Sequence, residues 1–188
     1  MASMMTFNHK GIEKGAQFFV IDHSVGRAGR NRVDDVQLVQ FLINRAIDIR
    51  EEEIKANQTN ELITPELKNR RFVDRNGRPL AKLVVDGKCG PKTVQAIFAF
   101  QNFYGQLSPV ADGTISAVSD PNRIEYVGGA NAKAPRGYYL KNTMYVLSVM
   151  AQGGAPHSPV FPILAEVKVQ PLRAALAKAV LEYVSQRL

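Results

Sequence analysis

The strongest constraint on the fold is the stretch 83–101, in which a turn motif leads directly into an apolar helical pattern. Its Asp86-Gly87 pair is typical of a tight turn, because aspartate accepts bonds from nearby backbone amides and glycine adopts a positive φ freely. Pro91 follows at a position that suits the first turn of a helix, where no backbone N–H is needed. Beyond it, one helical face gathers Val94, Ile97, Phe98 and Gln101. The stretch therefore predicts a turn followed at once by a helix with a buried side.

A second helix is predicted upstream, after a strand-like segment at 16–21 and a loop at 24–32 that is rich in glycine and polar residues. Asp34 or Asp35 suits its N-cap, since a short carboxylate accepts a bond from an unpaired backbone N–H. Apolar side chains then recur at helical spacing, at Val36, Leu38, Val39, Leu42, Ile43, Ala46 and Ile47. This pattern predicts an amphipathic helix of about 14 residues.

The remaining segments give weaker signals. Residues 48–80 are polar, and the glutamates 51–53 either prolong the first helix or begin another short one. A second Asp-Gly pair stands at 112–113, between apolar residues as the first does. The last segment, 119–188, contains stretches rich in glycine and proline and ends in an apolar helical face that begins at Pro171. The chain is therefore predicted to be mainly α-helical.

The net charge of +7 arises from 24 Lys and Arg against 17 Asp and Glu. Such a balance favours an anionic partner: nucleic acid, a membrane surface or a cell-wall polymer. The basic residues are spread along the chain without a long block, which makes nucleic acid the weakest of the three. Only residues 68–71 (Lys-Asn-Arg-Arg) are locally dense, and because Glu66 and Asp74 flank them we interpret them as a solvated polar loop.

The single cysteine, Cys89, excludes an internal disulfide framework and a multi-cysteine metal site. The first thirty residues show no signal-peptide pattern, and no apolar run reaches the roughly 18 residues of a membrane span. We therefore expect a chain that is cytoplasmic as synthesised. A place in the periplasm or cell wall would then require export without a leader.

Three segments carry a family resemblance in their order along the chain. They are residues 35–44, the run Val85-Asp86-Gly87-Lys88-Cys89-Gly90-Pro91-Lys92-Thr93 followed by Ala96-Ile97 and Phe100-Gln101, and residues 102–107 with 111–115. They resemble the first helix, the signature turn with the second helix, and the closing segment of the peptidoglycan-binding-like domain family. The resemblance covers about residues 33–118.

The resemblance implies a non-catalytic three-helix module that binds cell-wall peptidoglycan, in a bacterial or phage protein, without a cofactor. It divides the chain into a strand and loop lead-in at 1–32, the domain at 33–118 and an extension at 119–188 of unknown fold. Relative to the compact family form, 48–80 is a long insertion, and Cys89 replaces an aromatic or aliphatic residue. We therefore expect a three-helix core with an insertion and a helical C-terminal extension.

Two sets of site residues follow. The first set is expected to shape the turns and the helix start, a structural role: Asp86, Gly87, Gly90, Pro91, Thr93, Asp112 and Gly113. The second set offers the polar groups and the aromatic face that a saccharide needs: Lys92, Gln101, Asn102 and Tyr104. The second set is the predicted ligand-binding site.

The sequence gives no support for an enzyme or a metal site. His9, His23 and His157 lack any zinc-binding spacing. The tripeptide Asp22-His23-Ser24 contains the residue types of a catalytic triad, but adjacency in sequence is not triad geometry. Cys89, just before a helix N-terminus, is interpreted as a small packing residue.

The alternative function belongs to another class. It is a protein-interaction scaffold that reuses the same fold in a secretion-system, phage-particle or effector-associated assembly. The missing leader motivates it, together with the insertion at 48–80 and the extension at 119–188, which offer surfaces for a protein partner.

Overall fold

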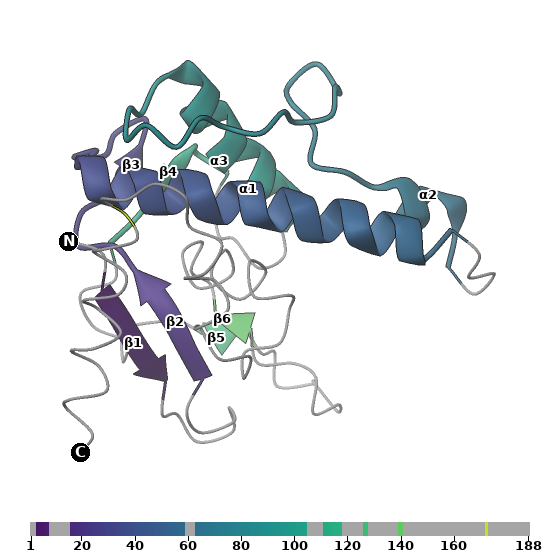
Figure 1. The fold of residues 1–188 in the computed structure, drawn as a ribbon, viewed down its shortest axis with the longest axis horizontal. Coiled ribbons are helices and arrows are strands. Elements are labelled where there is room, and N and C mark those ends of the chain that lie inside the picture. Colours follow the sequence, from purple (N-terminus) through teal and green to yellow (C-terminus); the bar gives the residue numbers. More distant parts are fainter. Residues whose placement is uncertain are drawn as a thin grey trace.

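The computed structural model describes residues 3–7, 16–58, 63–104, 111–117, 126–127, 139–140 and 172, and every structural statement below concerns these residues. This described part is mostly helical (Figure 1). Its helices are α1 (Val33–Ala56), α2 (Pro65–Asn69) and α3 (Pro91–Phe103). No helix in this part is long and apolar enough to cross a bilayer.

Three small antiparallel pairs of strands accompany the helices. β1 (Ser3–Phe7) pairs with β2 (Ala16–Val20), which confirms the strand predicted at 16–21. β3 (Val25–Gly26) pairs with β4 (Thr114–Ile115), and β5 (Tyr126–Val127) pairs with β6 (Tyr139–Leu140). The β3–β4 pair brings the loop before α1 against the second Asp-Gly turn, although about 90 residues separate them in sequence.

Helix α1 is longer than the sequence pattern predicts, with 24 residues instead of about 14. The glutamates 51–53 prolong it, which settles the choice left open by the sequence. Two contacts explain the extra turns. Ile54 is buried at 3% exposure and anchors the last turn, and Glu51 pairs with Arg71, which follows α2, at 2.7 Å.

The predicted N-cap of α1 is wrong. The N-cap residue is Arg32, and no side chain bonds the free amides of the first turn from that position. The carboxylate of Asp35 is instead fully buried and accepts backbone N–H bonds from Asp22 (3.4 Å) and His23 (3.2 Å). Asp35 therefore holds the segment that enters the β3 loop rather than its own helix.

The core forms where α1 crosses α3 and the N-terminal strand segment packs beside them. Its largest fully buried side chains are Phe19, Ile21, Leu38, Leu42, Ile43, Ile97, Phe100 and Ile115. The segment after α2 adds Phe72, which is 4% exposed and stacks on the ring of Phe100 at 5.7 Å. Leu172, the one described residue of the C-terminal helix pattern, is helical and buried in the same core. The predicted helix from 171 onward otherwise lies outside the described residues.

Candidate functional site

The first Asp-Gly turn is held by the amide of Gln40, which α1 buries at 2% exposure. Its Nε2 donates to Asp86 Oδ1, the Lys88 carbonyl and Thr93 Oγ1, each at 3.1 Å. Its Oε1 accepts from the backbone N–H groups of Asp86 (3.1 Å) and Gly87 (3.0 Å). The side chain of Gln40 thus attaches both the Asp86-Gly87 turn and the first helical turn of α3 to α1.

The second Asp-Gly turn is held in the same way by Gln101 of α3. Its Nε2 donates to Asp112 Oδ1 (3.2 Å) and to the Thr114 carbonyl (2.9 Å), and its Oε1 accepts from the N–H of Gly113 (2.8 Å). In both turns the aspartate also accepts a bond from the amide two residues ahead, at 2.9 Å for Asp86 and 2.8 Å for Asp112. The contacts of both turns are those of the structural role expected from the sequence.

The glycines of the two turns occupy equivalent places. Gly87 and Gly113 share a φ of +76°. Each lies against the valine that stands seven residues before its glutamine, Val33 for Gly87 and Val94 for Gly113. The two turns therefore use one packing arrangement twice, first on α1 and then on α3.

The charge of Asp86 is the basis of a pH-dependent prediction. The N–H of Lys88 and then the amide of Gln40 hold the pKa of the Asp86 carboxyl below its usual range, because both donate to the ionised form. A lowered pKa stabilises the fold above the ordinary value of about 4, and the gain disappears as the pH falls through the lower folded value. Asp86→Asn should therefore be less stable than wild type in urea unfolding at about pH 7, with the difference shrinking as the pH falls through the lowered folded pKa. A constant difference across this range would contradict the charge argument.

The four predicted ligand-binding residues do not form one site. Gln101 is buried at 1% exposure with its amide on the second turn, so it faces the protein interior. Tyr104 packs against the rings of Phe100 (4.9 Å) and Phe103 (4.8 Å), and burial raises the pKa of Tyr104 to about 12. Lys92 and Asn102 are both exposed, and Asn102 opens onto a groove.

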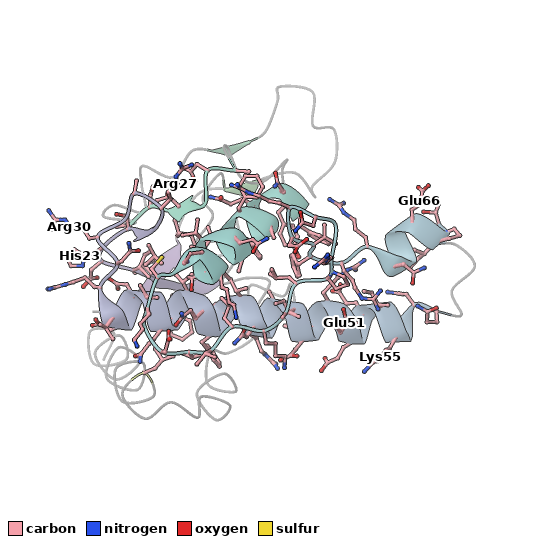
Figure 2. All side chains as sticks on the ribbon, turned by 90° about the horizontal axis from the view of Figure 1, so that it is seen from above. His23, Arg27, Arg30, Glu51, Lys55 and Glu66 are labelled. Atoms are coloured by element: carbon pink, nitrogen blue, oxygen red, sulfur yellow. The ribbon has the colours of Figure 1, made fainter. Side chains whose placement is uncertain are left out.

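That groove, here called the arginine groove, has a volume of about 630 Å³ and lies between α3 and the segment 69–75. Its walls are formed by Asn69, Arg70, Arg71, Val73, Asp74, Arg75, Phe98, Ala99, Asn102 and Phe103. The segment 69–75 therefore builds one wall of a groove beside α3. Figure 2 shows this segment running beside α3 above α1.

The guanidinium groups of the groove differ in how they are paired. Arg71 is neutralised by Glu51, with bonds of 2.7 and 3.2 Å. Arg70 lies 4.4 Å from the ring centroid of Phe103 and donates to that residue's carbonyl at 2.7 Å. The guanidinium of Arg75 lies 4.9 Å from the ring of Phe98. Arg70 and Arg75 thus keep an uncompensated positive charge at the groove among the residues described.

A second groove of about 570 Å³ adjoins the start of α3 and shares Arg75 with the first. Its lining includes Arg27, Asn31, Cys89 and Gly90. Burial raises the pKa of the Cys89 thiol, which stays protonated at neutral pH despite its place before a helix. A half-buried packing residue, as predicted, fits these surroundings.

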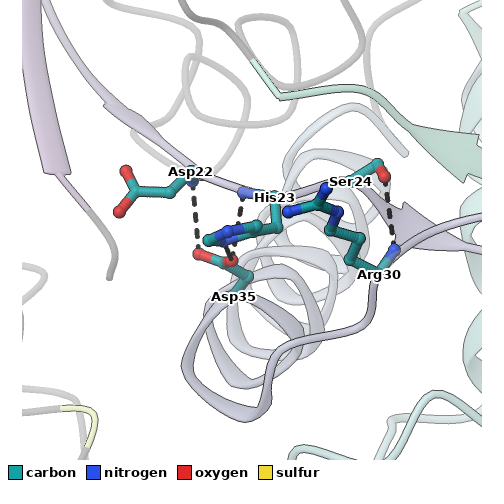
Figure 3. A network of polar contacts seen from close by, with 5 residues as sticks. All are labelled: Asp22, His23, Ser24, Arg30 and Asp35. Atoms are coloured by element: carbon teal, nitrogen blue, oxygen red, sulfur yellow. Dashed lines mark hydrogen bonds and ion pairs between the residues drawn. The ribbon is translucent and has the colours of Figure 1, made fainter.

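The Asp22-His23-Ser24 tripeptide does not assemble a triad (Figure 3). The partner of His23 is Asp35, whose Oδ2 lies 3.3 Å from His23 Nδ1. The Ser24 hydroxyl points away from this pair and accepts the backbone N–H of Arg30 at 3.3 Å. The arrangement closes the loop onto the start of α1.

Sequence reasoning missed the two stacked arginines, Arg70 and Arg75, among the three that line the groove. The segment 68–71 was interpreted as a solvated loop, but Asn69 ends α2 and Arg70 lies over a ring of α3. The only signal was the local density of basic residues, and nothing in it indicates the aromatic partners. Asn102 is the one residue of the groove that the resemblance pointed to.

Comparison with known proteins identifies no family for this chain. No protein-family model matches it, and no match was found among curated proteins or solved structures.

Proposed function

We propose that this chain binds bacterial cell-wall peptidoglycan through the arginine groove and catalyses no reaction of its own. The observation that carries the proposal is the place of the groove. It lies along α3, the helix that directly follows the signature turn, and it contains Asn102 from the predicted ligand-binding set. In this proposal α1 and α3 belong to a three-helix peptidoglycan-binding-like core, and the two glutamine-held turns close it.

The chemistry of the groove suits this polymer. Peptidoglycan presents sugar hydroxyls, amides and the carboxylates of its stem peptides. Asn102 offers both an amide donor and an amide acceptor. Arg70 and Arg75 supply positive charge, and neither is paired with a carboxylate among the residues that the structure describes. The dispersed net charge of +7 adds a weak general attraction to an anionic wall.

The proposal is tested by co-sedimentation of the full chain with purified sacculi at low and moderate salt. We expect retention that falls with salt, and a loss of about ten-fold in affinity for Asn102→Glu, which puts a negative charge into the groove that the two arginines line. Lys55→Ala is the matched control, because it also lowers the net charge by one and Lys55 lies exposed in the last turn of α1. Its retention should equal that of wild type.

Two results would count against the proposal. One is wild-type protein that stays in the supernatant at low salt. The other is an equal loss for both variants, which would assign binding to net charge alone. Absence of retention together with capture of a defined protein partner would favour the interaction scaffold.

A further inference from the structure

The guanidinium groups of Arg70 and Arg75 are positioned before any ligand arrives. Each lies over an aromatic ring of α3, at 4.4 Å for Arg70 over Phe103 and 4.9 Å for Arg75 over Phe98. The carbonyl of Phe103 fixes Arg70 further through a bond of 2.7 Å. A stacked guanidinium loses little side-chain freedom on binding, and its planar fork matches a carboxylate with two parallel bonds.

The neighbouring carboxylates make other contacts, so the positive charges of Arg70 and Arg75 stay available to a ligand. Arg50 and Arg71 are paired with Glu53 and Glu51, at 2.9 and 2.7 Å. Asp74 also lines the groove, but its Oδ1 accepts backbone N–H bonds from residues 76 (2.8 Å) and 78 (2.9 Å), which shapes its own turn. No ion pair joins Arg70 or Arg75 to an acidic side chain in the part of the chain described.

The two guanidinium groups stand at different points of the groove. Their rings, Phe98 and Phe103, are five residues apart on α3, which corresponds to about 7.5 Å along the helix axis and about 140° around it. Asn102 lines the same groove. The groove thus offers two separated carboxylate-binding positions and an amide that both donates and accepts.

We infer that Arg70, Asn102 and Arg75 form a subsite for a short peptide with two carboxylates, so that the chain recognises the stem peptide of peptidoglycan rather than its sugar strand. The inference rests on the proposed function. A peptide complements both the donor and the acceptor of the Asn102 amide, whereas a polyphosphate chain offers acceptors alone. A peptide-free sugar strand lacks the stem carboxylates that would pair with the guanidinium groups.

The experiment is calorimetric titration of the full chain with four soluble probes. They are a disaccharide-tetrapeptide muropeptide, the same muropeptide with its carboxyl groups amidated, peptide-free glycan strands and polyglycerol phosphate. We expect the unmodified muropeptide to bind at least about ten-fold more tightly than each of the other three, the loss of one charge-assisted bidentate pair.

Substitutions of the groove arginines test whether the muropeptide binds in the arginine groove. Arg75→Ala should weaken muropeptide binding about ten-fold, while Arg75→Lys, which keeps the charge but loses the fork, should fall between it and wild type. Arg75 makes no hydrogen bond within the described residues, and its contact with the Phe98 ring is exposed, so its removal should lower the thermal midpoint only slightly. Arg70→Ala should act in the same direction, and Lys55→Ala should bind as wild type does.

Equal binding of glycan strands, of amidated muropeptide or of polyglycerol phosphate would overturn the inference, and so would unchanged binding by Arg75→Ala. The proposed function is judged separately by retention on sacculi. Retention on sacculi without any preference for the stem peptide would support wall binding but contradict the stem-peptide subsite. Absence of retention removes the proposed function itself.

Discussion

Gln40→Ala is expected to lower the free energy of unfolding by about 3 kcal/mol, a large share of the 5–15 kcal/mol that holds a typical domain together. The amide of Gln40 is buried and bonds the first Asp-Gly turn and Thr93 at 3.0 to 3.1 Å. Alanine removes both halves of the amide. The buried N–H of Gly87 and the hydroxyl of Thr93 then lose a partner together, and an unsatisfied buried polar group costs about 1–3 kcal/mol.

The matched control is Gln37→Ala, one turn earlier on α1. Gln37 is also buried, at 8% exposure, but its side chain makes no hydrogen bond among the residues described. Both substitutions gain the same small amount of helix propensity, so the difference between them isolates the bonds to the turn. We expect Gln37→Ala to cost about 1 kcal/mol in urea unfolding. Similar losses for both variants would show that side-chain volume, not the bonds, carries the effect.

Local signals allowed the turns and the start of α3 to be predicted from sequence. Asp86-Gly87 forms a turn and Pro91 begins α3, because turn chemistry and the restricted φ of proline act within a few residues. The structural role expected for Thr93 fits its bond to the Lys88 carbonyl at 3.2 Å. The identity of the residue that holds the turn was missed, since Gln40 lies 46 residues upstream of Asp86.

The features that were not predicted correctly from the sequence depend on contacts between distant segments. The end of α1 is set by buried Ile54 and by Arg71, which lies 20 residues after its partner Glu51. The position of Asp35 is set by the backbone of the preceding loop. The arginine groove combines α3 with the segment 69–75 that precedes it, so neither segment alone predicts the groove. Gln101 was placed on the correct helix, but its amide is used by the protein itself.

Gly87→Ala is the second substitution with a large expected effect, again about 3 kcal/mol. Two costs combine at this position. Its φ of +76° is one that side-chain-bearing residues rarely adopt, and a Cβ there would lie 2.6 Å from Val33 Cγ1 and 2.9 Å from the Val33 carbonyl oxygen. Part of that clash is with backbone, so a change of rotamer cannot relieve it. The turn would have to move away from α1 and stretch the bonds that Gln40 makes to it.

The chain contains the control that separates the two costs. Gly77 has nearly the same φ, +74°, but an added Cβ would meet no atom within 4 Å. Gly77→Ala should therefore show the cost of the dihedral alone, about 1 kcal/mol. Gly113→Ala should fall between them, because its Cβ would lie 3.0 Å from Val94 Cγ1 and 3.3 Å from the Val94 carbonyl oxygen. Chemical unfolding of the three variants should give the order Gly77, Gly113, Gly87. If the three losses are equal, the left-handed dihedral explains them all, and the docking of each turn on its valine contributes nothing to stability.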